Sequence, residues 1–222
     1  SNGCRITVEL VANFPNYTRS PLPFFADNVR NSNPFDLVRV NNQLYVSDGG
    51  QNKIWRVDIN SGDFSVLARF APIPNPLPFG PPVVEAVPTG ITYLDGHLLV
   101  TLFRGFPFPA GESVVAKVDP NTGEHHRFIS GLKTAIDVLA VRSDDDCSND
   151  IQHLVLEFAS GDILSGPGRL LLFAQPDTAP VVIADCLAAP TSMALDSRTG
   201  TLYVTQLTGQ IAAILVGLER AR

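Results

Sequence analysis

Apolar and polar residues alternate along short stretches of this chain, and clusters of turn-forming residues separate the stretches. Between Asn33 and Phe70, four such stretches are joined by Asn41-Asn42, Asp48-Gly49-Gly50 and Asn60-Ser61-Gly62. The four stretches are Phe35–Val40, Gln43–Ser47, Lys53–Asp58 and Phe64–Phe70. Strands of about six residues joined by tight turns predict one antiparallel meander. A lone meander exposes one apolar face, so it must pack against a similar sheet.

The rest of the chain repeats this unit with a period of roughly 50 residues, which is typical of propellers. The second strands align as QLYVSD, HLLVTL, HLVLEF and TLYVTQ. The second unit has predicted strands at Ile91–Leu94, His97–Leu102, Ser113–Asp119 and Glu124–Ser130. The third has them at Ala135–Arg142, His153–Phe158, Gly168–Gln175 and Pro180–Cys186, and the fourth at Met193–Asp196, Thr201–Gln206 and Gln210–Val216. The sequence therefore predicts an all-β propeller, one domain over 1–222, with four-stranded antiparallel blades at 33–70, 87–130, 134–186 and 189–216.

The fourth unit has three strands, and the segment Arg5–Phe14 alternates like a strand but has no local partner. If this segment pairs as the outer strand of the last blade, two open sheet edges are satisfied together. The sequence thus predicts an N-terminal strand that closes the ring as a clasp.

Composition excludes several classes of protein. Apolar residues make up 45% and charged residues 17%, which argues against disorder. The net charge is −6 and no basic patch is visible, so neither nucleic acid nor an anionic membrane is an expected partner. No apolar run approaches the roughly 20 residues that a membrane-spanning helix needs. Neither a GxSxG elbow nor an HExxH motif occurs.

Cysteine usage and one sequon favour a secreted, periplasmic or extracellular protein. The three cysteines, Cys4, Cys147 and Cys186, fit neither a zinc site nor a CxxC redox pair, and predict one disulfide plus one odd thiol. Blade topology favours Cys4–Cys147, while a reaching loop would give Cys147–Cys186. Asn16 opens the sequon Asn16-Tyr17-Thr18 and is a predicted glycosylation site.

Two sets of polar residues are candidates for a site. Inner strands line a propeller's channel, and their polar side chains here are Asp36, Thr89, Asp137 and Ser192. The second strands end, at the rim, in Asp48, Leu102, Glu157 and Gln206. Carboxylate and amide oxygens at such positions suit Ca²⁺ or another divalent cation, with Asp48 and Glu157 as the predicted ligands. The alternative for Asp48 is a structural cap, because Asp before Gly-Gly commonly accepts hydrogen bonds from backbone amides.

A loop of unusual composition, FRGFPFPAG, spans 103–111. Its side chains Phe103, Arg104, Phe106 and Phe108 form either a lid over the channel or a platform for an apolar ligand or a partner protein.

Six stretches together, NPFDLVRV, LYVSDGGQNKIWRVD, VPTGITY, GFPFPAG, IDVLAV and LEFASGDILSG, resemble the ScyD/ScyE family. This family is named from scytonemin biosynthesis clusters and is related to NHL-type and gluconolactonase/strictosidine-synthase-like propellers. The resemblance implies that the chain corresponds to the last four blades of a six-bladed ring, as an alternative to the four-bladed clasp. It also implies a divalent metal near the axis, although Leu102 replaces an acidic residue that the family often has.

Three functions are consistent with these features. The first is an exported, non-enzymatic binding or assembly propeller that contacts a protein or a small apolar ligand. Its predicted contact residues are Asp36, Asp137 and Gln206 at the channel mouth and the four side chains of the Phe-rich loop. The second is a metal-dependent, lactonase-like hydrolase with Asp48, Glu157 and Asp137 around one cation. The third is a structural subunit that self-associates through open blades.

Overall fold

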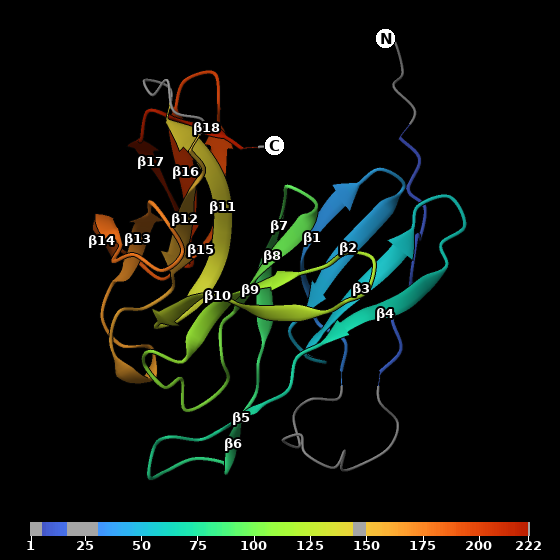
Figure 1. The fold of residues 1–222 in the computed structure, drawn as a ribbon, viewed down its shortest axis with the longest axis horizontal. Helices are drawn as coiled ribbons and strands as arrows, with labels where there is room; N and C mark the ends of the chain where they lie inside the picture. The colour runs from blue at the N-terminus through green and yellow to red at the C-terminus, as the bar shows by residue number, and fades with distance from the viewer. Residues whose placement is uncertain (1–5, 17–30, 144–149, 222) are drawn as a thin grey trace.

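The computed structural model describes residues 6–16, 31–143 and 150–221, and these residues form antiparallel sheets with almost no helix (Figure 1). The first sheet contains β1 (Pro34–Val40), β2 (Gln43–Asp48), β3 (Lys53–Asp58) and β4 (Phe64–Arg69), and the second contains β7 (Pro88–Leu94), β8 (His97–Leu102), β9 (Ser113–Val118) and β10 (His125–Leu132). The third contains β11 (Ala135–Ser143), β12 (Gln152–Glu157), β13 (Gly168–Phe173), β14 (Val181–Leu187) and β18 (Leu218–Arg220), and the fourth contains β15 (Pro190–Asp196), β16 (Thr201–Gln206) and β17 (Gln210–Leu215). A ladder of β5 (Ile73–Pro74) with β6 (Val83–Val84) and a short 3₁₀ turn, η1 (Asp162–Leu164), complete the described elements.

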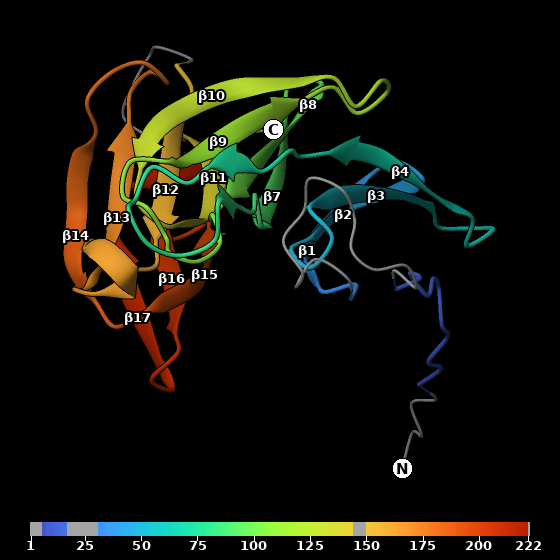
Figure 2. The same ribbon diagram turned by 90° about the horizontal axis from the view of Figure 1, so that it is seen from below.

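The four sheets are arranged as the blades of a β-propeller, which confirms the predicted fold class (Figures 1 and 2). In both views the first sheet (blue to cyan) lies at one end of the arrangement, the third (orange) and fourth (red) lie together at the other, and the second (green) lies between them. The innermost strands contact their neighbours in sequence order: β1 with β7, β7 with β11, and β11 with β15.

Apolar side chains fill the spaces between neighbouring sheets. One cluster joins Ile54 and Phe70 of the first blade to Val100 of the second, and another joins Val115 of β9 to Val155 of β12. A third joins the third and fourth sheets and includes Met193. Successive side chains of a strand point to opposite faces of its sheet. Because each face packs on a different neighbouring sheet, apolar residues on the two faces join separate clusters.

The hairpin turns have the chemistry that their geometry requires. Asp95 and Gly96, between β7 and β8, have φ of 46° and 80°. A two-residue turn whose two central residues both have positive φ matches the twist of an antiparallel pair, and Asp-Gly tolerates that backbone. The turn therefore fixes the register in which Leu94 faces His97.

The predicted clasp is wrong. The described part of the segment, residues 6–14, forms no strand, Arg5 lies outside the described residues, and the fourth sheet contains only β15, β16 and β17. Phe14 instead stacks on Trp55 of β3, with ring centroids 4.9 Å apart and an interplanar angle of 5°, and meets Phe64 edge-on. This contact covers the outward flank of the first sheet, because burying a large indole and a phenyl ring favours docking there.

The described residues contain no helix long and apolar enough to cross a membrane.

Candidate functional site

Two carboxylates of the inner strands hold neighbouring sheets together. Asp36 of β1 accepts hydrogen bonds from its neighbour Leu37 N at 2.8 Å and from Ile91 N of β7 at 3.0 Å. Asp137 of β11 repeats this arrangement, because it accepts from Val138 N at 2.8 Å and from Met193 N of β15 at 2.8 Å. Each aspartate therefore satisfies one amide of its own strand and one amide of the next blade.

Asp137 is the more unusual of the two, because it is buried, with 5% of its surface exposed. Burial raises the pKa of Asp137 from 3.8 to about 7, and the nearby charge of Asp36 raises it further, while the bonds from Met193 N and Val138 N and from the Ser192 hydroxyl at 3.2 Å oppose the rise. The geometry thus places a carboxyl that titrates near neutral pH between the third and fourth sheets.

The second sheet has Gly90 at the position of these aspartates, and it makes room for Asp137. A Cβ on Gly90 would lie 2.6 Å from both the Cα and the Oδ1 of Asp137. The Thr89 hydroxyl lies 2.8 Å from the Thr101 hydroxyl. Thr101 also donates to Ile136 O of the third sheet at 3.2 Å, so in the second blade a hydroxyl makes a bond to the next sheet.

The rim residue Asp48 is buried and works as a cap. Its Oδ1 accepts from three backbone amides, Asn33 N at 2.9 Å and Gly50 N and Gln51 N at 3.1 Å. Its Oδ2 accepts from Ser32 Oγ at 2.7 Å and from Trp55 Nε1 at 2.9 Å. The structural role that an Asp before Gly-Gly predicts is therefore present.

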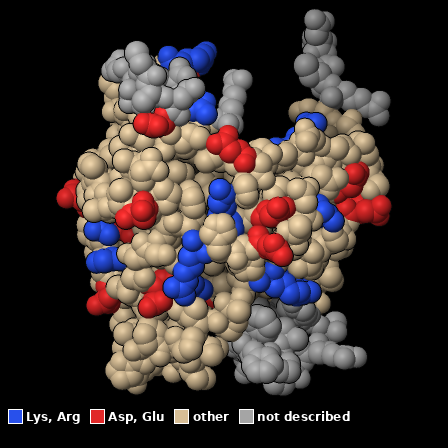
Figure 3. All heavy atoms as spheres, in the orientation of Figure 1, with Lys and Arg blue, Asp and Glu red and all other residues tan. Residues whose placement is uncertain are grey.

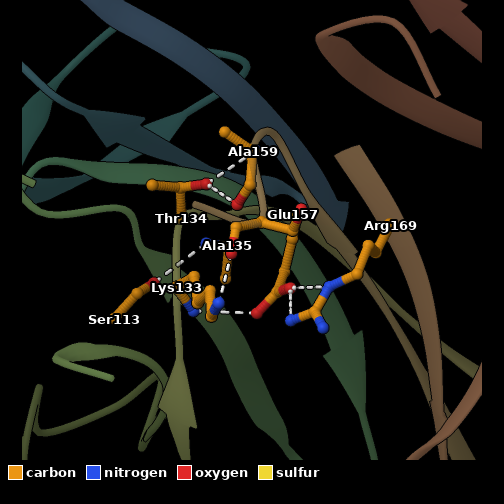
Figure 4. A network of polar contacts seen from close by, with 8 residues as sticks. Ser113, Lys133, Thr134, Ala135, Glu157, Ala159 and Arg169 are labelled. Carbon is orange, nitrogen blue, oxygen red and sulfur yellow. Dashed lines mark hydrogen bonds and ion pairs between the residues drawn. The ribbon is translucent and has the colours of Figure 1, made fainter. Parts of the chain in front are cut away.

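Glu157, the corresponding residue of the third sheet, is 1% exposed and combines a cap with an ion pair (Figure 4). Its Oε1 accepts from Lys133 N at 2.8 Å, and its Oε2 accepts from Arg169 Nε at 2.9 Å. Arg169 Nη2 lies close to the same oxygen, so the two side chains form a salt bridge. Figure 4 also shows that the Thr134 hydroxyl donates to Ala159 O and accepts from Ala159 N. These two hydrogen bonds fix the start of β11.

Three of the four rim residues thus have the same structural role. The side chain of each accepts a hydrogen bond from the backbone N–H of a residue just before the inner strand of its own blade. The pairs are Asp48 with Asn33, Glu157 with Lys133, and Gln206 with Ala188. Leu102 of the second sheet cannot accept a hydrogen bond, and the corresponding amide of Val87 donates to Asn52 Oδ1 at 2.8 Å instead. The ends of the four second strands are therefore structurally equivalent positions, and the polar residues at three of them stabilise the linkers between blades.

These contacts bear on the metal hypothesis. Among the described residues, no group of three or more His, Cys, Asp or Glu side chains is arranged to hold a metal ion. The oxygens of Asp48 and Glu157 already accept hydrogen bonds from the protein, and the two residues belong to different sheets. A cation at the rim stays a prediction from the sequence.

The Phe-rich loop forms a continuous row of aromatic rings. Phe158, after β12, meets Phe103 with centroids 5.9 Å apart, and Phe103 meets Phe108 at 6.0 Å. Phe108 meets Phe106 at 6.1 Å, and Phe106 meets Phe79 at 6.5 Å. The row runs from partly buried rings to an exposed tip, where Phe79 is 44% and Phe106 51% exposed. The loop is therefore both a packed cover at its base and an exposed aromatic surface at its end.

Sequence reasoning missed Phe79, because it belongs to the proline-rich stretch between the first two blades, which reads as a plain connector. The available signal was a lone aromatic residue among the prolines of Pro72–Pro82.

Arg104 of the Phe-rich loop is not part of the aromatic row. It is 3% exposed, and its Nε donates to Glu112 O at 2.9 Å.

The cysteine and glycosylation predictions fall largely outside the described residues. Cys4 and Cys147 are not among them, whereas Cys186 is an exposed free thiol, so the Cys147–Cys186 pairing is not formed. Asn16 is exposed and its side-chain oxygen accepts from Ser32 N at 2.8 Å. Its glycosylation stays a prediction.

Comparison with known proteins yields distant structural similarity. No protein-family model and no curated protein matches the chain. Similar solved structures include a chain of a nidogen/laminin complex, at 14% identity over 82% of this chain and 78% of that chain, with a TM-score of 0.31. They also include the PQQ-bound aldose sugar dehydrogenase of Streptomyces coelicolor (14% identity, 83% and 81% coverage, TM-score 0.35) and TolB from Acinetobacter baumannii (11%, 82% and 53%, 0.33). Similarity at this level does not transfer a function, and the likeness to the ScyD/ScyE family stays a prediction.

Proposed function

We propose that this chain is an exported, non-enzymatic β-propeller that binds a protein partner through the aromatic tip, meaning the exposed rings of Phe79 and Phe106. The observation that supports this function is the exposure of two adjacent phenylalanines on separate loops. Exposed neighbouring aromatic side chains are costly in water and are enriched at the centres of protein interfaces.

The loops that carry the tip are held in place before any partner binds. Asn75 Nδ2 donates to Phe79 O at 2.7 Å and to Pro81 O at 2.8 Å, which closes the loop between β5 and β6. In the other loop Pro107 and Pro109 are buried on either side of Phe108. A surface that is already ordered loses little conformational entropy on binding, so more of its contact energy contributes to affinity.

A peptide selection tests this proposal directly. The full chain is immobilised and a random peptide library is selected against it, and each enriched peptide is titrated by calorimetry against wild type and the Phe79→Ser/Phe106→Ser variant. We expect the double substitution to weaken binding by at least about 10-fold, since two central aromatic contacts are lost. The matched control is Ile211→Ser/Leu215→Ser, which removes two exposed apolar side chains from β17. Peptides that bind the aromatic-tip variant as tightly as wild type would contradict the proposal.

A second candidate, assembly through an open blade, is supported by the fourth sheet. Its outward flank exposes Tyr203 (45%), Ile211 (71%) and Leu215 (79%). An uncovered apolar sheet face favours packing on another sheet. Analytical ultracentrifugation of the full chain separates the candidates: a self-associating species that Ile211→Ser/Leu215→Ser dissolves supports assembly, and a monomer at all concentrations removes it.

The hydrolase alternative draws no comparable support from the described residues. Its proposed ligands Asp48 and Glu157 hold linker amides and Arg169, and Asp137 holds Met193 N of the fourth sheet. Binding by the aromatic tip is therefore the function that the geometry favours.

A further inference from the structure

A pocket of about 260 Å³ lies between the first and second blades, on the outer side of their shared core. One wall is Phe70 and the connector that follows it, up to Ile73. The opposite wall is the face of the second sheet that presents Leu102, Val114 and Ala116. These walls are apolar.

The polar groups that line this pocket are all basic. They are Arg104, Arg127, His125 and His126. Neither Asp nor Glu occurs among the described residues that line it. By contrast, the larger cavity near His97 is lined by Lys117 together with Asp119 and Glu124, so it carries charges of both signs. In Figure 3 a group of Lys and Arg side chains runs down the middle of the face shown, over the outer strands of the second sheet.

Arg104 is the decisive residue. Arg104 is buried, with 3% of its surface exposed, and its Nη1 is a buried donor without a hydrogen-bond partner among the described residues. Burial, and then the charge of Arg127, lower the pKa of Arg104 to about 10, so it remains charged at neutral pH. A buried guanidinium normally has an anionic partner, because its desolvation is otherwise uncompensated.

Among the described residues, Arg104 donates its hydrogen bond to a neutral oxygen, while the nearby charge of Glu112 raises the pKa of Arg104 against the effects of burial and Arg127. Glu112 accepts from Arg104 Nε with its backbone carbonyl, at 2.9 Å. The register of β10 on β9 places Arg127 opposite Ala116, on the same wall of the pocket. Arg104 and Arg127 therefore both line this cavity, and no carboxylate is found among the described residues that line it.

We propose that this pocket binds a small monocarboxylate with a compact apolar body, whose carboxylate pairs with Arg104 and Arg127 and whose body packs against Val114, Ala116 and Phe70. A planar carboxylate suits a guanidinium because the two groups form parallel charge-assisted hydrogen bonds. A volume of about 260 Å³ admits an aromatic acid the size of benzoate and is small for a drug-sized ligand. The site does not rest on the aromatic tip, and its probe is not a peptide.

The test is a titration of the ¹⁵N-labelled full chain with benzoate, followed by NMR. We expect benzoate to shift the Arg104 Nε–H signal and the amides of Val114 and Ala116, with a Kd on the order of 1 mM or tighter, which is usual for a ligand of so few atoms. Benzamide has the same shape without the charge, acetate has the charge without the body, and inorganic phosphate is a different anion. Each is expected to bind at least about 10-fold more weakly than benzoate.

Two variants and one control connect binding to the pocket. Arg104→Met should abolish benzoate binding. Arg127→Gln changes an exposed side chain, so we expect the fold to be kept and binding to weaken about 10-fold. Arg198→Gln removes a highly exposed guanidinium from the turn after β15 and should leave binding unchanged. The proposal is overturned if benzamide or phosphate binds as well as benzoate, if the shifts lie outside the pocket, or if Arg127→Gln binds like wild type.

Discussion

Replacing Asp137 by Asn is expected to change how the stability of this protein depends on pH. The pKa of Asp137 is raised from 3.8 to about 7, so the folded chain holds this proton more tightly than the unfolded chain does. Asp137 therefore contributes most to stability below pH 4, and this contribution is lost as the pH rises towards 7.

The magnitude follows from the size of the shift. At 1.36 kcal/mol per unit, a rise from 3.8 to about 7 corresponds to roughly 4 kcal/mol of free energy of unfolding. Asn carries no charge at any pH, although it keeps an oxygen that can accept from Met193 N or Val138 N. The difference in stability between Asp137→Asn and wild type should therefore move in favour of the variant by roughly 4 kcal/mol between pH 4 and pH 8.

Urea unfolding at several pH values from 4 to 8 measures this difference. Asp36→Asn is the informative companion, because the charge of Asp36 contributes to the raised pKa of Asp137. The free energy of unfolding of Asp36→Asn should fall less steeply with pH than that of wild type and more steeply than that of Asp137→Asn. If Asp137→Asn and wild type lose stability in parallel over this range, Asp137 is not the buried titrating group that the structure describes.

Three further changes have defined outcomes. Glu157→Gln should lower the free energy of unfolding by about 2 kcal/mol, because the Arg169 guanidinium loses its charged partner; urea unfolding with no change would contradict the ion pair. Phe14→Ala should shift the fluorescence of Trp55, the single tryptophan, to longer wavelength, because Trp55 loses the ring stacked on it; an unshifted spectrum would place Phe14 elsewhere. His153→Leu should stabilise the protein most at acid pH, because burial lowers the pKa of His153 from 6.5 to about 4. Wild type therefore loses free energy of unfolding as the pH falls from 6.5 to about 4, and the Leu variant does not lose this contribution. Unfolding curves that show the same acid sensitivity in both proteins would refute this prediction.

Local sequence predicts most of the fold. The strands of each meander begin and end within three residues of their predicted limits, because turn residues such as Asp95 and Gly96 mark the ends of hairpins. The N-terminal segment fails for a clear reason. Alternation in residues 6–14 reports an extended chain but does not identify its partner, and contact with Trp55 decides that. Strand β18 was missed because three residues are too few to show a period.

The candidate site was predictable in position and not in chemistry. Asp36 and Asp137 were singled out as polar residues of inner strands, but their partners Ile91 and Met193 lie 55 and 56 positions further along the chain. Only the packing of one blade on the next brings those amides within reach. Asp48 and Glu157 likewise lie at equivalent positions, the ends of their second strands, yet whether a carboxylate binds an amide or a cation depends on donors that the sequence does not place.

Amide hydrogen exchange at Ile91 and Met193 tests the central claim most directly, namely that inner-strand carboxylates join the first blade to the second and the third blade to the fourth. In wild type both amides should be protected, because each donates to a carboxylate of the preceding unit. Asp36→Ala should speed exchange at Ile91 by at least about 10-fold and leave Met193 protected. Rapid exchange at both amides in wild type, or protection of Ile91 that survives the loss of Asp36, would contradict the account.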